Sequence, residues 1–161
     1  MRSKHPRADH PEPTEPSEHT AGDLYPTPTR RDLLDAIAGQ HVLVAADGRI
    51  TLTDTGRRVT AAVDEMVQAG WATKPAGGGT VQLTATGRAV RAVRILNYGD
   101  HVVAETGPHD AATCLGTAYQ GVDGWTVTVG PISLTCGSPT AAANELRRRA
   151  VGVLAAQDPD R

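Results

Sequence analysis

The stretch ITLTDTGRRV spans residues 50–59, and VQLTATGRAV spans residues 81–90. At an offset of about thirty residues, both fit the pattern apolar-x-Leu-Thr-x-Thr-Gly-Arg-x-Val. Each copy follows a turn that contains glycine and leads into a run of apolar residues with helical spacing. Such repetition predicts a unit of hairpin, threonine-capped corner and helix that is used twice. Because two copies are too few for a solenoid, we expect them to be two halves of one small domain.

The composition sets limits on the core. The chain has 161 residues and no Phe, so its core must be built from Val, Leu, Ile and Ala with two Trp. A chain of this length usually makes one domain or two small ones. The formal net charge is −2, but residues 27–100 carry nine basic residues against seven acidic ones. The middle of the chain is therefore the segment that favours an anionic partner, although only slightly.

No sequence signal points to a membrane or to secretion. No apolar run approaches the length that a transmembrane helix needs, and the N-terminus lacks the apolar region of a signal peptide. We therefore expect a cytoplasmic protein, from a genome of high GC content, given its many Arg, Ala, Thr and Gly residues. Its two cysteines are expected to be free thiols, at opposite ends of a sheet.

The first 26 residues are predicted to be a disordered tail. They contain five prolines with charged and hydroxyl residues between them, so few side chains could be buried. Three histidines of this segment could bind a metal weakly. A solvated tail is the favoured interpretation, because ligands without a rigid scaffold must bear the full entropic cost of ordering.

The next elements are predicted to be a helix, a hairpin and a second helix. Thr27 or Thr29 can cap the first helix, which has Leu33, Leu34 and Ile37 on its apolar side and ends at Gly39. Residues 42–52 are predicted to be a hairpin that turns at an Asp-Gly pair. The helix over residues 54–69 would then be capped by Thr53. Its buried face is predicted to consist of Val59, Val63, Met66 and Val67.

The second copy of the repeat is expected to follow a β-wing. Residues 71–74 and 80–83 are predicted strands, and the glycine-rich segment 75–79 between them is predicted to be a flexible loop. Thr84 is the expected cap of the helix that follows. Its inward side would hold Val90, Val93 and Leu96, and its exposed side would carry a basic strip of Arg88, Arg91 and Arg94.

The segment VTAAVDEMVQAGWATKPAGGGTVQLTATGRAV, residues 59–90, resembles the second half of a winged helix-turn-helix domain. In that family, a recognition helix ends before an Ala-Gly-aromatic turn. A β-wing with a glycine-rich tip follows, and then a strand that ends in Leu-Thr-x-x-Gly-Arg. The resemblance covers about residues 27–97. It departs from the family where the hairpin 42–52 replaces a short helix before the recognition helix.

The resemblance implies binding to duplex DNA through the helix over 54–69 and the wing at 75–79. The start of the recognition helix enters the major groove in this family, and Arg can hydrogen bond to guanine edges there. Wing residues and further arginines would contact phosphates. An alternative interpretation is that these are ordinary surface residues, balanced by nearby carboxylates. The implied DNA-binding residues are Arg57, Arg58, Thr60, Ala61, Lys74, Arg88 and Arg91.

The last third predicts a second domain over residues 112–161, after a linker or extra strand at 98–111. Three short strands at 115–120, 124–130 and 132–136 precede a helix that is capped by Ser138. This β-β-β-α order is weakly similar to the three-stranded DNA-binding modules of some tyrosine recombinases. The exposed face would lack positive charge, however, which favours a protein contact or homodimerisation over DNA contact. The buried stripe of the helix is predicted to be Ala142, Leu146, Ala150 and Val153.

The chain carries no motif that is typical of an enzyme or of a phosphate-binding loop. His101, His109, Cys114 and Cys136 are too irregularly spaced for a usual zinc site, so we expect no metal and no cofactor. The overall prediction is an α+β protein with a disordered N-terminal tail, a winged-helix-like domain and a β-β-β-α domain. We expect a non-enzymatic DNA-binding protein, either a transcriptional regulator or an accessory factor of a phage or mobile element. The alternative is a protein-interaction adaptor that uses the same scaffold without nucleic acid.

Overall fold

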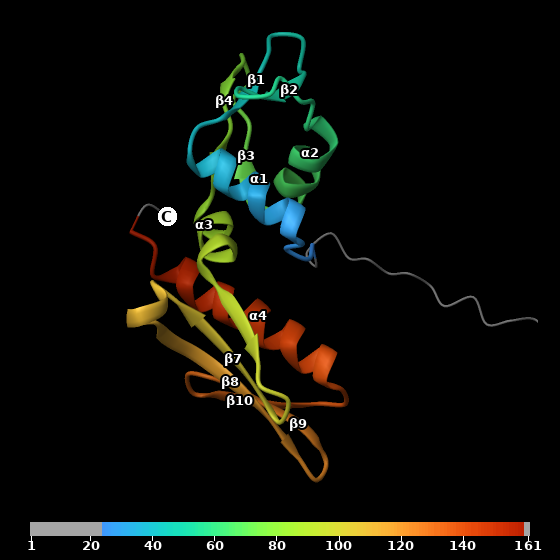
Figure 1. Cartoon of the computed structure of the whole chain (residues 1–161), viewed down its shortest axis with the longest axis vertical. Coiled ribbons are helices and arrows are strands. Elements are labelled where there is room, and N and C mark those ends of the chain that lie inside the picture. The colour runs from blue at the N-terminus through green and yellow to red at the C-terminus, as the bar shows by residue number, and fades with distance from the viewer. Residues whose placement is uncertain (1–23, 160–161) are drawn as a thin grey trace, which may run out of the picture.

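The computed structural model describes residues 24–159, which form a mixed α+β fold. Small sheets and the helices α1 (Pro28–Ala38) and α2 (Thr60–Gln68) make one half, and a five-stranded sheet covered by α4 (Pro139–Ala156) makes the other (Figure 1). Helix α3 (Ala85–Ala92) lies between the halves and packs against α4. The predicted tail falls outside the described residues except for residues 24–26. These three residues lie against the fold, since Pro26 is buried and Tyr25 contacts Arg147.

Helix α1 (Pro28–Ala38) forms as its sequence predicts. The side chain of Thr27 accepts a hydrogen bond from the backbone N–H of Arg30, and Pro28 occupies the first turn, where its missing N–H costs nothing. Leu33, Leu34 and Ile37 are buried, as expected from their spacing. Gly39 ends the helix, also as predicted.

The first copy of the repeat forms a hairpin and not a capped helix. Strands β1 (Val42–Val44) and β2 (Ile50–Leu52) are antiparallel, as predicted. Beyond β2 the chain turns again at Gly56, whose φ is 66°, and Arg58 bridges back to Thr51. Helix α2 (Thr60–Gln68) therefore begins six residues later than predicted. Thr53 does not cap it, because residues 57–59 are held beside β2 by backbone hydrogen bonds.

Helix α2 leads into the predicted wing. Val63 and Met66 are buried, and Val59 just before the helix is buried too. Strands β3 (Ala72–Thr73) and β5 (Gln82–Leu83) pair with each other. Between them, β4 (Gly79–Thr80) pairs with β1, which places the end of the glycine-rich loop against the first hairpin. The predicted flexible loop is thus attached to the fold at its second end.

The second copy of the repeat forms the corner that the sequence predicts. Thr84 accepts a hydrogen bond from the N–H of Gly87 and caps α3 (Ala85–Ala92). Gly87 lies inside this helix, against the backbone of Trp71. A β-carbon at Gly87 would lie 1.8 Å from the carbonyl oxygen of Trp71, so only glycine allows α3 to approach β3 this closely.

The basic strip predicted along α3 is not continuous. The helix ends at Ala92, and Arg94 already belongs to strand β6 (Arg94–Asn97). Leu96 therefore lies on a strand, where it is only partly buried, whereas Val90 and Val93 are buried as predicted. The reason is β pairing: β6 pairs with β7 (His101–Thr106), which provides partners for its backbone groups.

The C-terminal sheet has five antiparallel strands in the order β10-β9-β8-β7-β6. The three predicted strands are present as β8 (Thr113–Gly121), β9 (Gly124–Val129) and β10 (Ile132–Cys136). Strands β6 and β7 extend this sheet, and a short 3-10 helix, η1 (His109–Ala111), connects β7 to β8. The sheet therefore begins at Arg94, well before the predicted start of the β-β-β-α unit. The two cysteines are free, as expected.

Helix α4 (Pro139–Ala156) covers one face of this sheet. Ser138 caps it by accepting a hydrogen bond from the N–H of Ala141, as predicted. Ala142, Leu146 and Ala150 are buried, but Val153 is 38% exposed and Val151 is buried in its place. Helix α4 packs against α3 as well as the sheet, and Val151 belongs to the same buried cluster as Val90 and Val93 of α3.

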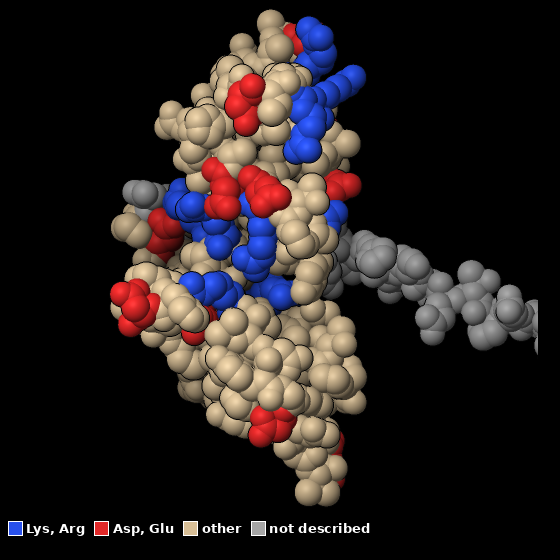
Figure 2. Space-filling view, viewed as in Figure 1, with Lys and Arg blue, Asp and Glu red and all other residues tan. Residues whose placement is uncertain are grey.

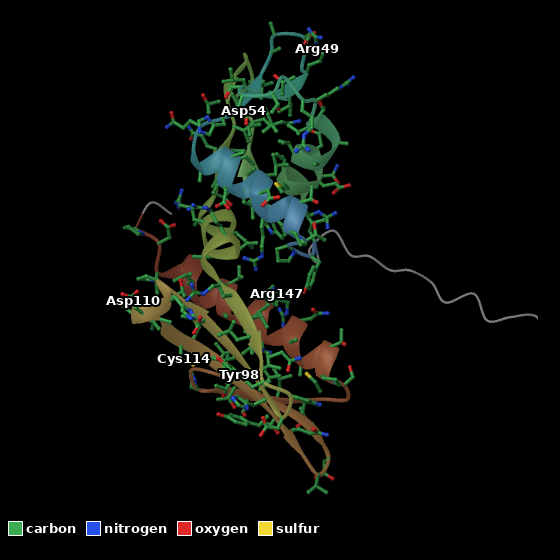
Figure 3. The ribbon with its side chains drawn as sticks, viewed as in Figure 1. Arg49, Asp54, Tyr98, Asp110, Cys114 and Arg147 are labelled. Atoms are coloured by element: carbon green, nitrogen blue, oxygen red, sulfur yellow. The ribbon has the colours of Figure 1, made fainter. Side chains whose placement is uncertain are left out.

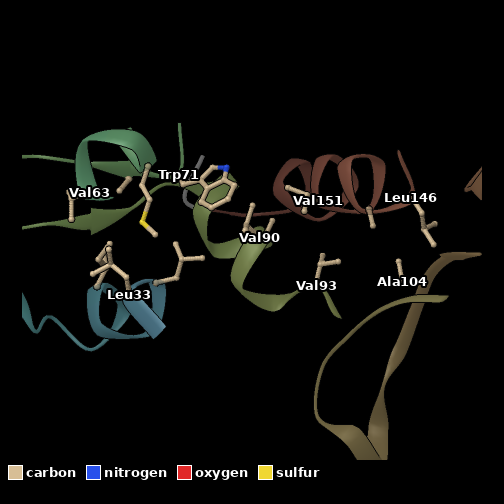
Figure 4. Packing of buried hydrophobic residues seen from close by; sticks show 14 of the residues in the cluster. Leu33, Val63, Trp71, Val90, Val93, Ala104, Leu146 and Val151 are labelled. Atoms are coloured by element: carbon tan, nitrogen blue, oxygen red, sulfur yellow. The ribbon is translucent and has the colours of Figure 1, made fainter. Parts of the chain in front are cut away.

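The buried side chains form one continuous cluster through both halves. Figure 4 shows the row from Leu33 and Val63 through Trp71 to Val90 and Val93, and onward to Leu146 and Val151. Helix α3 supplies the middle of this row. Its packing connects the helical half to the sheet.

Candidate nucleic-acid interface

The strongest positive feature of the helical half is the pair Arg57 and Arg58. Both side chains are exposed, and neither forms an ion pair with any carboxylate of residues 24–159. They lie on the strand-like segment that returns from the turn at Gly56 and runs directly into α2. Two adjacent arginines without acidic partners are suited to an anionic partner.

Thr60 organises this corner from within. Its hydroxyl accepts a hydrogen bond from the backbone N–H of Ile50 at 3.0 Å and lies 3.4 Å from Nε of Arg58. Thr60 therefore holds the start of α2 against β2 and orients Arg58. The sequence predicted that Thr60 contacts DNA. In the structure, its side chain already takes part in this structural hydrogen bond.

The N-terminus of α2 carries no side-chain cap and no acidic residue in its first turn. The first N–H groups of a helix have no partner within the helix, and the helix dipole makes that end partly positive. Ala61, which is exposed in this first turn, leaves room for a ligand to approach the backbone. The uncapped end and the two arginines thus present positive potential on the same corner.

The other three predicted DNA-binding side chains are paired with carboxylates. Lys74 lies 2.5 Å from Asp64, and Arg91 lies 2.5 Å from Asp35. Arg88 binds Asp158 through Nε and Nη2, at 2.6 and 3.0 Å. Their charges are compensated locally, so the structure does not bring them together with Arg57 and Arg58 into one basic surface.

One further arginine of this corner was not singled out by the sequence. Arg49 lies at the tip of the β1–β2 hairpin (Figure 3), two residues before Thr51, which pairs with Arg58. It contacts the carboxylate of Asp47 at 2.6 Å. The backbone N–H of Arg49 is the main cause of the lowered pKa of Asp47, and the arginine side chain adds to it. The turn at Gly56 brings Arg58 beside strand β2, close to Arg49 along that strand. Spacing along the chain does not show this proximity, so the sequence did not single out Arg49.

The distribution of charge separates the two halves. On the face shown in Figure 2, basic side chains gather at the end with the β1–β2 hairpin and in a mixed band of acidic and basic residues around the middle. The sheet half below the band is nearly uncharged on this face. We call Arg49, Arg57 and Arg58 the basic corner. Acidic side chains also lie at this end, among them Asp47, which pairs with Arg49.

The open face of the five-stranded sheet has no lysine or arginine among its central residues. Tyr119, Thr126, Thr128, Ser133 and Thr135 are exposed there, as predicted from their alternation along the strands. The ring of His101 stacks on Tyr98 on one side and on Tyr119 on the other, with ring centroids 4.8 and 5.5 Å apart. These residues of the face are polar or aromatic, and they offer no charge that would attract phosphates.

Among residues 24–159, no helix combines the length and apolar character that crossing a bilayer requires. No group of three or more His, Cys, Asp or Glu side chains in that range is arranged to hold a metal ion. Comparisons of this chain with protein families, with curated proteins and with solved structures gave no match.

Proposed function

We propose that this chain is a non-enzymatic protein that binds duplex DNA through the basic corner and the start of α2. The observation that carries the proposal is the pair Arg57 and Arg58, exposed and without carboxylate partners in the described chain, beside the uncapped end of α2. A transcriptional regulator or an accessory factor of a mobile element would use such a corner. The winged-helix resemblance of residues 27–97 supports the same proposal.

The physical basis is neutralisation of phosphates. Each arginine that contacts a phosphate releases a condensed counterion from the duplex, so affinity falls as salt rises. Free backbone N–H groups at the start of a helix can bind phosphate oxygens, as they bind other anions. Arg57 and Arg58 need not break an ion pair with a described carboxylate before binding, which distinguishes them from Arg88 and Arg91.

The paired residues are expected to contribute less. Ion pairs at exposed positions are worth about 0–1 kcal/mol, so a phosphate could replace Asp64 at Lys74 or Asp35 at Arg91. The carboxylates would then remain near the duplex and repel it. We therefore assign the main contact to Arg57 and Arg58 and a secondary, salt-sensitive contact to the paired residues.

The test is binding of the full chain to a fluorescent duplex over a series of salt concentrations. The double variant Arg57→Ala/Arg58→Ala is expected to bind at least about tenfold more weakly at low salt. The plot of log affinity against log salt should also become less steep, by about two in slope for the two arginines, since each phosphate contact contributes about 0.9. The double variant Arg148→Ala/Arg149→Ala is the matched control, because it removes two adjacent charges from the other half.

Two results would contradict this assignment. One is the absence of binding by the unmodified chain at low salt. The other is an equal loss of affinity in both double variants, which would indicate a response to net charge and not to the basic corner.

A second candidate function is protein contact through the open face of the C-terminal sheet. The uncharged face with the stacked rings of Tyr98, His101 and Tyr119 favours it, and self-association of this chain would be its simplest form. Sedimentation of the full chain, compared with the variant Tyr119→Asp, tests this. If the unmodified chain is strictly monomeric at high concentration, self-association is excluded. An adaptor function with another partner then remains as the candidate.

A further inference from the structure

A pocket of about 300 Å³ lies where the two halves of the molecule meet. Its walls come from the residues just before α1, from α1 itself, from β6 and from α4, and they include Tyr25, Pro28, Arg31, Arg94, Ile95 and Arg147. Figure 3 shows Arg147 at this junction, between the helical half and the sheet. The pocket is separate from the basic corner, which lies at the far end of the helical half.

Three arginines line this pocket, and only one has a carboxylate partner in the described chain. Arg94 binds Glu105, with its Nε 3.1 Å from the carboxylate oxygen. Arg31 instead donates to the carbonyl of Val93 at 3.1 Å. Two of the three guanidinium groups therefore have no acid within 4 Å among residues 24–159.

Arg147 is held in an unusual environment. Its Nη2 donates to the hydroxyl of Tyr25 at 3.1 Å, and its guanidinium carbon lies 4.3 Å from the centre of the Tyr25 ring. Its Nε is buried and has no hydrogen-bond partner among the described residues. A buried polar group without a partner is costly, and more so when the group is charged.

The two guanidinium groups also act on each other. Burial lowers the pKa of Arg31, and the positive charge of Arg147 lowers it further, while Tyr25 and the carboxylate of Asp35 act in the opposite direction. Like charges that are partly removed from water repel each other, and an anion between them would relieve both the repulsion and the loss of solvation. The start of α1 lies at the same pocket, with Pro28 on its wall, and adds the positive end of a helix dipole.

We propose that this pocket binds a small oxyanion, the phosphate or carboxylate group of a small molecule. A guanidinium group presents two parallel N–H donors that match the oxygens of phosphate or carboxylate, and the side chains of Arg31 and Arg147 both line the pocket. Ile95, Pro28 and the ring of Tyr25 provide apolar contacts for an attached organic group. Because the walls come from both halves, the bound anion would hold α1 and α4 in their relative positions.

The proposal is independent of DNA binding and can be tested separately. Inorganic phosphate and succinate are titrated into the full chain by calorimetry, at an ionic strength kept constant with sodium chloride. Saturable binding is expected for one or both, and the stronger of the two identifies phosphate or carboxylate as the preferred group. Arg147→Gln and Arg31→Gln are each expected to weaken binding at least about tenfold, the loss that accompanies removal of one charged hydrogen bond.

The matched control is Arg148→Gln, the next residue on the same helix. It removes the same charge, but this side chain binds Glu145 and does not line the pocket. Circular dichroism of each variant checks folding, and Arg31→Gln provides the test if Arg147→Gln fails to fold. The variant Arg57→Ala/Arg58→Ala should bind the anion like the unmodified chain, whatever its affinity for DNA.

Two outcomes would overturn the site. One is that neither anion gives saturable heat beyond that of sodium chloride. The other is that Arg148→Gln loses as much affinity as Arg147→Gln, which would show attraction to net charge only.

Discussion

Gly56 and Gly87 hold the same position in the two copies of the repeat, but glycine is required at each position for a different physical reason. Gly56 has a φ of 66° in an exposed turn, with open space where a β-carbon would be. Gly87 is helical and buried, and a β-carbon there would collide with the backbone of Trp71. The first glycine is required by backbone conformation and the second by close packing.

The substitutions Gly56→Ala and Gly87→Ala should therefore destabilise the protein to different extents. The left-handed conformation costs alanine about 1–2 kcal/mol at Gly56. At Gly87, forcing α3 away from Trp71 is expected to cost about 2–3 kcal/mol, the upper part of the range for overpacked sites. Urea unfolding of both variants measures the difference. Gly56→Asn should recover most of the loss at that position, because Asn accepts the left-handed region; equal effects of the two alanines would contradict this account.

Glu145 is predicted to make the stability depend on pH. Hydrogen bonding to Arg148 is the main cause that lowers its pKa; burial opposes the shift and Arg149 adds to it. A carboxyl group with a lowered pKa in the folded state stabilises the fold above its ordinary pKa and loses this contribution as the pH falls through the folded value. Lowering the pH below the ordinary glutamate range should thus destabilise the unmodified chain more than Glu145→Gln. Parallel pH profiles of unfolding for the two proteins would exclude this role.

At the scale of the element, the same residue types form two different corners. Thr84 caps α3 and also donates its hydroxyl hydrogen to the carbonyl of Gly70 at 2.6 Å. Thr53 is exposed, and its segment forms a second hairpin in which residues 57–59 lie beside β2. The hydroxyl of Thr60 accepts from Ile50, which fixes where α2 can begin. Local sequence favours a capped helix in both places, but pairing with β2 prevails in the first.

The substitutions Thr84→Ala and Thr53→Ala test this difference between the corners. Loss of the cap at Thr84 is expected to lower the free energy of unfolding by about 1–2 kcal/mol. Thr53→Ala should change it by less than about 0.5 kcal/mol, as for other exposed positions without a specific bond. Both values come from denaturant unfolding under the same conditions. A loss at Thr53 as large as that at Thr84 would mean that both corners are capped.

At the scale of the whole molecule, α3 makes one core out of two halves. Val90 and Val93 of α3 are buried, and Leu146, Ala150 and Val151 of α4 belong to the same cluster. The Arg88–Asp158 ion pair joins α3 to the segment that follows α4. Because no boundary of polar residues divides the cluster, the described chain should unfold as a unit.

Each half contains one buried tryptophan, Trp71 and Trp125, which allows a direct measurement. In the variant Trp71→Phe, fluorescence reports on the sheet, and in Trp125→Phe it reports on the helical half. We expect the fluorescence midpoint of each variant to coincide with its own circular-dichroism midpoint. Val151→Ala, added to either variant, should lower both midpoints together. Separate transitions, or an effect of Val151→Ala on Trp125 alone, would show two independently folding halves.

The sequence by itself determined the elements whose signals are local. The cap and apolar face of α1, the hairpin 42–52, the order of β8, β9 and β10, and the cap of α4 all follow from spacing, turn residues and capping residues. The exposure of Arg57 and Arg58 also agrees with their polar pattern. These features depend on neighbours within a few residues, so a pattern of residue types is sufficient to predict them.

Tertiary structure decided the features that depend on residues far apart in the chain. It gave LTDTGR and LTATGR different conformations, because β2 is beside the first and Trp71 is beside the second. It ended α3 at Ala92, because β7 offers partners to β6. It also paired Arg88 and Arg91 with Asp158 and Asp35, which lie 70 and 56 residues away. Charge compensation and strand pairing across such separations are properties of the folded chain, and spacing along the sequence does not encode them directly.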